Sequence, residues 1–353
     1  MKAALFFGPM DVRVLDVPKP KIDEDEALIR VKICTTTGTT VKQYVRPYPG
    51  WGYPHGFGYE WVGEVEEVGR EVDKSLIGKR CILSRPPRTC NCFFCLRGRS
   101  NLCSQRRDTR RIDQRTDDPD KGIVSGCFKE YMKAPASLIK LIPKHLSTED
   151  VCQVPSIGLV QHGNNNVNIK MGDTVATVGS GAIGMIHMML SHLRGAQTVA
   201  IDKSQSRLDF AKKIGAADYI INAQNTDEAK KGLKELNINE GYGPDVVIEA
   251  VGLPETYEEA FELVRRGGQV LMYGGAQLGT TINLDTYHLH YDELTIVASS
   301  SGTPIDRARA YNLVERGMIK PSVFISGEYP LVEVKEALEL HRTQKGIKYA
   351  VIP

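Results

Sequence analysis

The spacing of hydrophobic and polar positions differs between the two parts of the chain. In the first part, apolar and polar residues alternate in short runs such as Ala27–Ile33 and Trp61–Val68, and Gly and Pro interrupt these runs frequently. Successive side chains of a β-strand point to opposite faces, so a period of two predicts half-buried strands joined by turns. We expect residues 1–155 to form an antiparallel β domain resembling a small barrel.

After about Pro155, apolar strands alternate with helical patterns. Strand patterns occur at Thr174–Val178, Thr198–Ile201, Tyr219–Ile221, Asp245–Glu249 and Gln269–Tyr273, and helical patterns at Ala182–Leu193, Gln205–Ile214 and Tyr257–Arg266. Such alternation is typical of βαβ units around a parallel sheet. The predicted fold class is therefore α/β, with a doubly wound parallel sheet over residues 156–291.

The remaining residues, 292–353, continue these patterns. They contain a strand pattern at Leu294–Ala298, helical patterns at Asp306–Arg316 and Val332–Thr343, and a last strand pattern at Ile347–Ile352. We expect this C-terminal segment to return in part to the first domain.

Composition and charge narrow the class of protein. The 353 residues, of which 41% are hydrophobic and 25% charged, suffice for two globular cores. The 45 Lys and Arg nearly balance the 43 Asp and Glu, which leaves no electrostatic argument for a nucleic-acid or membrane-surface partner. Thr174–Ser191 lacks charged residues, but its three glycines favour a strand, a turn and a helix over a membrane span. The opening apolar run of five residues is too short for a secretory signal, so a cytoplasmic location is expected.

A glycine-rich turn follows the strand Thr174–Val178 and begins a helical pattern. Glycines at such a turn let the backbone approach a pyrophosphate, whose charge meets the positive helix N-terminus; a turn without a ligand is the alternative. Asp202 ends the next strand, 23 residues after Gly179, where a carboxylate binds the adenosine ribose and repels a 2′-phosphate. This predicts NAD, while nearby Lys203 and Arg207 leave NADP open. The cofactor candidates are Gly179, Gly181, Ala182, Ile183, Gly184, Asp202, Lys203, Arg207, Val251 and Gly274.

Half of the eight cysteines lie within 14 residues: Cys90, Cys92, Cys95 and Cys103. Four thiolates suit a closed tetrahedral Zn²⁺ site with a structural role, in a reducing compartment. Only one residue separates Cys90 from Cys92, where two usually separate paired ligands, which allows for a displaced or missing ligand. Free cysteines, or a lobe that has lost its metal, are the alternatives.

Two further segments have unusual composition. Residues 106–121 carry six positive and five negative side chains and a single aliphatic one, which is typical of a solvated surface loop. A lid or subunit contact that offers Arg to an anionic substrate is the alternative. The Pro- and Gly-rich segment 46–57 holds several aromatic residues, either as a packed surface loop or beside a sugar or other ring-bearing substrate.

Taken together, these motifs resemble the medium-chain dehydrogenase/reductase superfamily, on its alcohol, polyol and sugar dehydrogenase branch. The resemblance covers essentially the whole chain. It rests on the Gly63–Gly69 segment GEVEEVG, the cysteine lobe, the GSGAIG turn, a strand at Gly126–Tyr131, and the ending KYAVIP at Lys348–Pro353. It implies a GroES-like catalytic domain, a Rossmann domain that binds NAD, and a homo-dimer or homo-tetramer.

The chain departs from the superfamily at the three ligands of the catalytic zinc. The resemblance would place there the Cys of a Cys-Gly-Thr-Asp stretch, the His of a Gly-His-Glu motif, and a Glu or Cys near a Glu-Pro-Leu-x-Cys stretch. In this sequence these stretches read Thr37-Gly-Thr-Thr40, Gly58-Tyr-Glu60 and Val154-Pro-Ser-Ile-Gly158. Neither Thr, Tyr nor Val is a plausible zinc ligand. We predict that the structural zinc is retained and the catalytic zinc is lost.

Without a metal, hydrogen-bond donors must stabilise the charge that develops on the substrate oxygen. Tyr59 can donate its phenol, and Lys42 stands where many members carry a proton-relay His. Thr39 matches the superfamily's relay hydroxyl, and Glu60 could orient Lys42 or Tyr59. The predicted catalytic residues are Tyr59, Lys42, Thr39, Glu60 and Thr37. An ordinary core tyrosine and a solvated lysine are the alternatives for the first two.

These residues predict an NAD-dependent oxidoreductase that interconverts a secondary alcohol and a ketone of a polyol, cyclitol or sugar derivative. A zinc-free reductase of C=N or activated C=C bonds is the second hypothesis, because its substrate needs less stabilisation at oxygen. A nucleotide-binding scaffold with a decayed site is the third.

Overall fold

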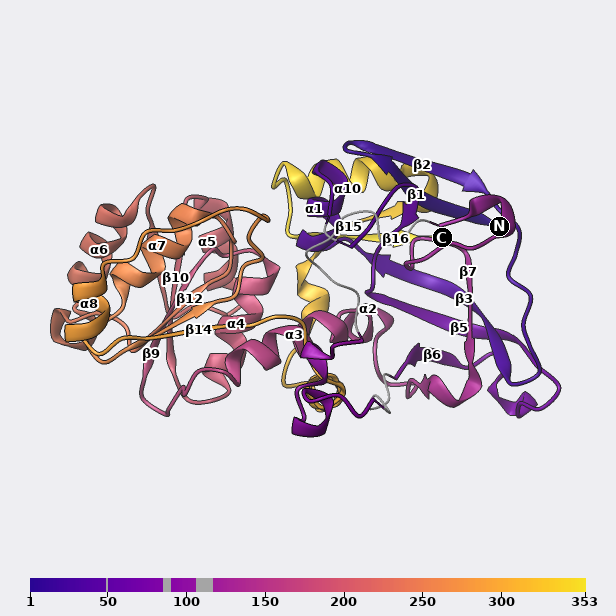
Figure 1. Ribbon diagram of the computed structural model, residues 1–353, viewed down its shortest axis with the longest axis horizontal. Coiled ribbons are helices and arrows are strands. Elements are labelled where there is room, and N and C mark those ends of the chain that lie inside the picture. Colours follow the sequence, from indigo (N-terminus) through magenta and orange to yellow (C-terminus); the bar gives the residue numbers. More distant parts are fainter. Residues whose placement is uncertain (49, 85–89, 106–116) are drawn as a thin grey trace. The chain divides into compact units, whose positions relative to one another are not determined.

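The computed structural model describes residues 1–48, 50–84, 90–105 and 117–353. They divide into two compact units (Figure 1). Unit 1 comprises Met1–Pro155 and Arg307–Pro353, and unit 2 comprises Ser156–Asp306. Helices α3 (Val154–Asn164) and α9 (Pro304–Glu315) contain the two points at which the chain passes from one unit to the other.

Unit 1 contains two β-sheets. The larger has the order β15 (Ile325–Pro330), β16 (Lys348–Ile352), β3 (Glu26–Thr35), β5 (Trp61–Val68), β6 (Arg80–Leu83) and β8 (Ile139–Leu141), with β7 (Tyr131–Pro135) also on β3. The smaller joins β2 (Asp11–Asp16), β1 (Lys2–Gly8) and β4 (His55–Gly56). All of these pairs are antiparallel except β15 with β16. The predicted antiparallel β domain is confirmed.

One expected strand of unit 1 begins later than the sequence indicated. Residues 126–130 form no regular strand, and β7 starts at Tyr131. Gly126 has a φ of +72°, and a Cβ there would lie 2.0 Å from the carbonyl oxygen of Phe57. The backbone at Gly126 passes close to that of Phe57 and is not extended there, which explains why β7 does not begin earlier.

The C-terminal strand β16 pairs antiparallel with β3, Ala350 opposite Thr35 and Val351 opposite Cys34. In Figure 1 these yellow residues lie beside indigo residues from the start of the chain. The pairing brings Lys348 to the end of β3, which leads directly into α1 (Gly38–Val45).

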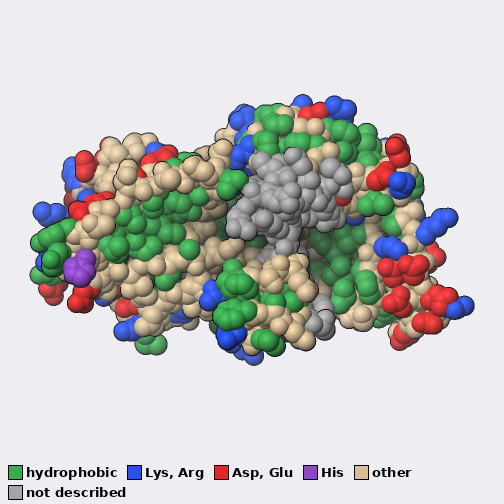
Figure 2. Space-filling view, viewed as in Figure 1, with side chains coloured by type: hydrophobic (Ala, Val, Ile, Leu, Met, Phe, Trp, Pro, Cys, Tyr) green, Lys and Arg blue, Asp and Glu red, His purple; other side chains and the backbone are tan. Residues whose placement is uncertain are grey.

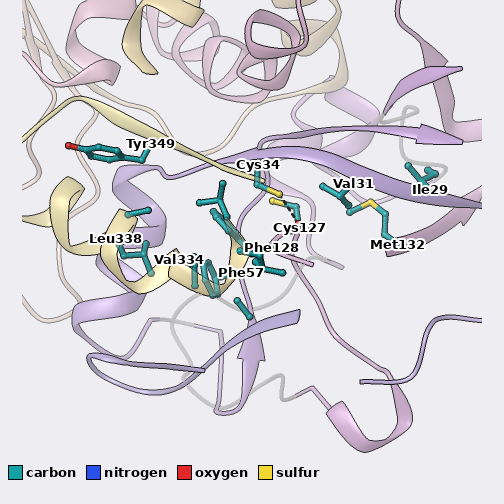
Figure 3. Close-up of a cluster of buried hydrophobic side chains, with 14 of the residues drawn as sticks. Ile29, Val31, Cys34, Phe57, Cys127, Phe128, Met132, Val334, Leu338 and Tyr349 are labelled. Atoms are coloured by element: carbon teal, nitrogen blue, oxygen red, sulfur yellow. Dashed lines mark hydrogen bonds between the residues drawn. The ribbon is translucent and has the colours of Figure 1, made fainter. Parts of the chain in front are cut away.

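The core of unit 1 lies between the sheets and α10 (Val334–Arg342), as Figure 3 shows for one cluster of buried side chains. Phe57 and Phe128 stack with ring centroids 4.6 Å apart, and Phe57 also stacks on Phe6 at 3.9 Å. Val334 and Leu338 cover the cluster from α10. The short helix α2 (Thr148–Cys152) packs against β3 and β5.

Unit 2 is built on a six-stranded parallel sheet. The strand order is β11 (Tyr219–Asn222), β10 (Gln197–Asp202), β9 (Thr174–Val178), β12 (Val246–Glu249), β13 (Gln269–Met272) and β14 (Thr295–Ala298). The helices that join or follow the strands are α4 (Ala182–His192), α5 (Gln205–Lys213), α6 (Thr226–Glu235), α7 (Pro254–Leu263) and α8 (Thr286–Tyr291). The doubly wound α/β prediction is confirmed, and the strand that sequence patterns placed in the C-terminal segment is the edge strand of this sheet.

Within the described ranges, no helix combines the length and the apolarity that crossing a membrane requires.

Candidate functional site

The glycine-rich turn of unit 2 joins the end of β9 to the start of α4. Gly179 has a φ of +98°, and a Cβ on it would lie 2.6 Å from Cγ2 of Val251. A Cβ on Gly184 would lie 1.9 Å from the carbonyl oxygen of Gly179. Only glycine fits these two positions. The backbone therefore makes a tight turn that leads directly into the N-terminus of α4.

Two buried hydroxyls at this turn have no hydrogen-bond partner in the described part of the chain. They belong to Thr177 on β9 and Ser180 in the turn, and both residues are fully buried. Buried hydroxyls are normally paired, so these two suit a ligand that brings acceptors, as a dinucleotide pyrophosphate does. The turn, its glycines and the helix N-terminus fit the phosphates of a dinucleotide.

Asp202 ends β10 beside the glycine turn. Its Oδ2 accepts a hydrogen bond from the backbone N–H of Ser180 at 2.6 Å, and its Oδ1 accepts one from the N–H of Ser204 at 2.8 Å. Arg207 lies close by on α5: burial lowers the pKa of its guanidinium, and the charge of Asp202 acts in the opposite direction. The carboxylate is therefore fixed at the edge of the turn, where the adenosine ribose binds in this type of fold.

The structure brings the remaining cofactor candidates of unit 2 to the same edge of the sheet. The side chain of Val251 lies against Gly179, and Gly274 follows the neighbouring strand β13. Lys203 follows Asp202, and its carbonyl accepts from Gln224 at 3.2 Å. Gly181, Ala182 and Ile183 form the start of α4.

Glu249 is a residue of this site that the sequence interpretation missed. It is fully buried at the end of β12. Its Oε1 accepts hydrogen bonds from the N–H groups of Val251 at 2.8 Å and Gly252 at 2.6 Å, and from the Thr256 hydroxyl at 2.8 Å. Its Oε2 accepts a hydrogen bond from the N–H of Gly274 at 3.1 Å. One carboxylate thus holds together the loops after β12 and β13. A lone acid that ends an apolar strand three residues before a glycine is the signal that could have found it.

In unit 1, Thr37 begins α1 and forms a capping box. Its hydroxyl accepts from the N–H of Thr40 at 3.2 Å, and its own N–H donates to the Thr40 hydroxyl at 2.7 Å. The side chain predicted to act in catalysis is therefore engaged at the helix N-terminus. Thr39 and Lys42 are three residues apart on α1, so they share a helix face, and both are partly buried.

Tyr59 and Glu60 lie immediately before β5. The N–H of Thr35 donates to the carbonyl of Glu60 at 3.2 Å, which places this pair beside the end of β3, the strand that leads into α1. Gly58 has a φ of +86°, and a Cβ there would lie 2.4 Å from the ring of Phe128. The packed Phe128 ring thus fixes the backbone just before Tyr59, whose side chain is partly buried.

The carboxylate of Glu60 is fully buried and is held by two groups. Lys348 Nζ and the hydroxyl of Thr35 both contact Glu60 Oε2. Lys348 is itself only 2% exposed. These partners differ from Lys42 and Tyr59, the ones expected from sequence. Glu60 Oε1 has no hydrogen-bond partner among the described residues.

Three buried thiols are linked to this ion pair, either directly to Glu60 or through a neighbouring residue. Cys34 Sγ donates to the carbonyl of Cys127 at 2.8 Å, as Figure 3 shows, and Cys127 Sγ to the carbonyl of Glu60 at 3.4 Å. Cys152 Sγ lies 3.9 Å from the Thr35 hydroxyl. Burial raises the pKa of Cys34 and of Cys152, so both remain neutral thiols. The Glu60–Lys348 pair thus sits in surroundings of low polarity.

The aromatic segment 46–57 packs around His55. Nδ1 of His55 lies 2.6 Å from the carbonyl oxygen of Gly52, and its ring centroid is 5.1 Å from that of Trp51 and 5.3 Å from that of Tyr53. Asp117 Oδ2 accepts from the N–H of Gly56 at 2.6 Å and fixes the end of the segment. Residues 106–116 of the charged segment lie outside the described residues.

The four cysteines of the predicted metal lobe come together. The Sγ atoms of Cys90, Cys92, Cys95 and Cys103 all lie within 4.8 Å of one another. That spacing and the four soft donors fit one tetrahedral Zn²⁺. Hydrogen bonds from the Ser104 hydroxyl and from backbone N–H groups lower the pKa of Cys92 to about 5, which favours a thiolate. The single-residue spacing after Cys90 does not move its sulfur out of the group. Among the described residues, no other group of three or more His, Cys, Asp or Glu side chains is placed to share an ion.

Comparison with known proteins agrees with this geometry. Residues 23–144 match the alcohol dehydrogenase GroES-like domain, and residues 182–316 match the zinc-binding dehydrogenase family. The chain is 28% identical to D-arabinitol dehydrogenase 1 of Uromyces fabae, over 100% of this chain and 97% of that protein. It is 31% identical to the sorbitol dehydrogenase of Bacillus subtilis, with the same coverage. The chain belongs to the medium-chain dehydrogenase/reductase superfamily.

A solved member of the superfamily shares the fold over the full chain. It is a putative zinc-binding dehydrogenase from Sinorhizobium meliloti bound to NADP, with a TM-score of 0.83, 26% identity, and coverage of 100% of this chain and 99% of that one. As a superfamily member, the present chain is an oxidoreductase that uses a nicotinamide cofactor.

Proposed function

We propose that this medium-chain enzyme interconverts a secondary alcohol and a ketone of a polyol, cyclitol or sugar derivative, with NAD(H) and without a catalytic zinc. The observation that carries the zinc-free part is the identity and use of the residues at the three ligand positions. Thr37 caps α1, Tyr59 is a phenol, and Val154 is a buried aliphatic residue. These side chains do not fit a zinc ion, which needs thiolate, imidazole or carboxylate donors.

The proposed substrate class follows the relatives. Proteins 28–31% identical over nearly their whole length include D-arabinitol and sorbitol dehydrogenases. The aromatic segment around His55 supports this class, since rings beside a polyol pack against its C–H groups while hydroxyls bind its oxygens.

Bound nicotinamide would supply or accept the hydride. The chain's own task is then to stabilise the substrate oxygen and to move one proton. We assign Tyr59 as the donor to that oxygen, with Thr39 and Lys42 passing the proton onward along one face of α1. One well-placed donor contributes about 3–4 kcal/mol of transition-state stabilisation. The buried Lys348–Glu60 pair holds the backbone from which Tyr59 projects.

We propose NAD over NADP because of Asp202. Its carboxylate is anchored by two backbone N–H groups beside the glycine turn, so a 2′-phosphate would meet a fixed negative charge. Together with one structural zinc on Cys90, Cys92, Cys95 and Cys103, NAD completes the proposed cofactor set. A cytoplasmic location is also proposed, because the four cysteines must stay reduced to bind this zinc and the cytosol keeps thiols reduced.

A homo-oligomer is also proposed. In the described part of the chain, β14 pairs only with β13 and leaves its other edge open. Open edges are covered in many proteins by a second copy. Light scattering on the purified protein should give a dimer or tetramer.

The test of the proposed reaction combines binding with turnover. Purified protein is titrated with NADH by fluorescence and then assayed with NAD⁺ on a panel of polyols and cyclitols. Tyr59→Phe should lower kcat by roughly 10²–10³ with the affinity for NADH unchanged. Tyr242→Phe, at a residue 73% exposed, is the matched control.

Three results would contradict the proposal. If Tyr59→Phe turns over the alcohol with an unchanged kcat, Tyr59 is not the donor to the substrate oxygen. Turnover confined to imines or activated C=C bonds favours the reductase hypothesis. Failure to bind NAD(H) at all favours a scaffold with a decayed site.

A further inference from the structure

Helix α1, which carries Thr39 and Lys42, is too short to hold its shape alone. It has eight residues, whereas isolated helices of fewer than about 12–15 residues are marginal in water. The side chains on its buried face are Thr40, Gln43 and Tyr44. The helix therefore takes its position from the elements that pack against this face.

Helix α10 lies beside α1 and is hydrogen-bonded to its last turn (Figure 1). The Tyr44 hydroxyl donates to Glu339 Oε1 at 2.8 Å, although 295 residues separate the two in the sequence. Arg342 holds the same carboxylate from within α10, because its Nε donates to Glu339 Oε2 at 2.8 Å. Burial and the bond to Glu339 raise the pKa of Tyr44, so its phenol stays protonated and remains a donor.

The same turn of α10 also contacts the residue just before the cap of α1. His341 Nδ1 lies 2.8 Å from the hydroxyl oxygen of Thr36, which is fully buried. The Thr36 hydroxyl also accepts from the N–H of Tyr349 at 3.0 Å, and the Thr36 N–H donates to the Tyr349 carbonyl at 2.9 Å. The chain that enters α1 is thus held by α10 and β16 together.

The two contacts from α10 act at opposite ends of α1. Thr36 precedes the helix and Tyr44 belongs to its last turn, and Thr39 and Lys42 lie between them in the sequence. One bond would still let a short helix pivot, whereas bonds at two separate points oppose both sliding and rotation. We call these two bonds, Tyr44 to Glu339 and Thr36 to His341, the α10 clamp.

We propose that Glu339 and His341 are positioning residues for the reaction, because they hold α1 at both of its ends. The helix held in this way places Thr39 and Lys42 for proton transfer. This rests on the proposed function, which assigns the proton relay to those two side chains. Successive groups of a relay must lie within hydrogen-bond reach of one another. A displacement of about 1 Å can therefore cost up to roughly 10²-fold in rate, although neither residue of α10 need touch substrate or cofactor.

Variants that remove or keep each bond of the clamp test the inference. Glu339→Leu and His341→Leu should each lower kcat about 10-fold, with KM and the affinity for NADH unchanged. The solvent deuterium isotope effect on kcat should rise in both, because proton transfer becomes the slower step. Glu339→Gln and His341→Asn keep a hydrogen-bonding group and should restore most of the rate. Glu336→Leu, at an exposed residue of the same helix, is the matched control.

Hydrogen exchange separates this inference from the proposed reaction, because it needs no substrate. In the NADH-bound protein, amide exchange of residues 38–45 should become faster in both leucine variants and stay as in the wild type in Glu336→Leu. If this is found but the wild type turns over no alcohol, the proposed reaction fails and the α10 clamp stands.

Three results would overturn the inference. Exchange in α1 could be the same in the leucine variants as in the wild type. It could become faster while kcat and its isotope effect keep their wild-type values. It could also become faster to the same extent in α2 and in unit 2, which would mark a general loss of stability.

Discussion

Lys348 and Glu60 form an ion pair inside unit 1 although 288 residues separate them in the sequence. The pair joins the C-terminal strand β16 to the residue next to Tyr59. Because both side chains are at most 2% exposed, each charge depends on the other for its compensation. The last residues of the chain therefore help to position the proposed catalytic tyrosine.

Breaking this pair should be costly. Lys348→Met leaves a buried carboxylate without its cation, and we expect a loss of about 3–5 kcal/mol in the free energy of unfolding. Adding Glu60→Gln to Lys348→Met should recover much of this loss, because the second change removes the unpaired charge. Chemical denaturation of Lys348→Met, Glu60→Gln and the double variant measures the coupling. Lys345→Met, at an exposed lysine of the same segment, is the control; equal losses for both lysines would refute a buried pair.

Asp202 should set the cofactor preference. Asp202→Ala removes the carboxylate beside the glycine turn, so we expect kcat/KM for NAD⁺ to fall roughly 10-fold and the NADP⁺ to NAD⁺ ratio to rise. Asp209→Ala, at an exposed residue on α5, is the control. An unchanged ratio of NADP⁺ to NAD⁺ activity would show that Asp202 does not bind the adenosine ribose.

Glu249 should position the cofactor loops without contacting substrate. In Glu249→Gln, an amide replaces an oxygen that accepts from backbone N–H groups of loops after β12 and β13. We expect a loss of about 1–3 kcal/mol in stability and weaker NADH binding. Glu255→Gln at an exposed site is the comparison. Unaltered NADH affinity together with reduced stability would confine Glu249 to a structural role.

Unit 2 should lose stability in mild acid because of His187. Burial lowers the pKa of this histidine to about 3, and Arg194 adds to the effect. In the unfolded chain its pKa is about 6.5, so below that pH the unfolded state binds the extra proton and is favoured. The stability that neutral His187 contributes is complete above about pH 6.5 and falls by up to about 1.4 kcal/mol per pH unit towards pH 3.

The pH dependence of thermal unfolding checks this prediction. His187→Gln should flatten the fall between pH 6.5 and 4, whereas His145→Gln, at an exposed histidine, should leave it as in the wild type. Parallel curves for wild type and His187→Gln would show that another group controls acid unfolding.

Local patterns predicted most of unit 2 because its strands are buried and its turns carry glycines. The strand Thr174–Val178 has the same bounds in sequence and structure, and Asp202 ends the next strand as expected. The same local reasoning located the cysteine lobe, and the structure brings Cys90 into it despite the tight spacing.

Local sequence patterns could not predict contacts between residues that lie far apart in the chain. Nothing near Glu60 in the sequence indicates that Lys348 is its partner, because the contact depends on β16 joining β3. Glu249 was missed for a related reason: its role comes from N–H groups in two loops that only the folded sheet brings together. The Thr37 hydroxyl, one of the predicted catalytic groups, accepts a hydrogen bond at the start of α1.

The central claim is that the reaction proceeds without a metal beside the substrate, and zinc content measured together with turnover tests it most directly. Elemental analysis should find about one zinc per chain in the wild type and almost none in Cys92→Ser/Cys95→Ser, with Cys81→Ser as the thiol control. The account predicts that the zinc-depleted variant loses stability yet keeps its turnover per folded chain at low temperature. Two zinc ions per chain, or a second ion whose removal abolishes turnover, would contradict it.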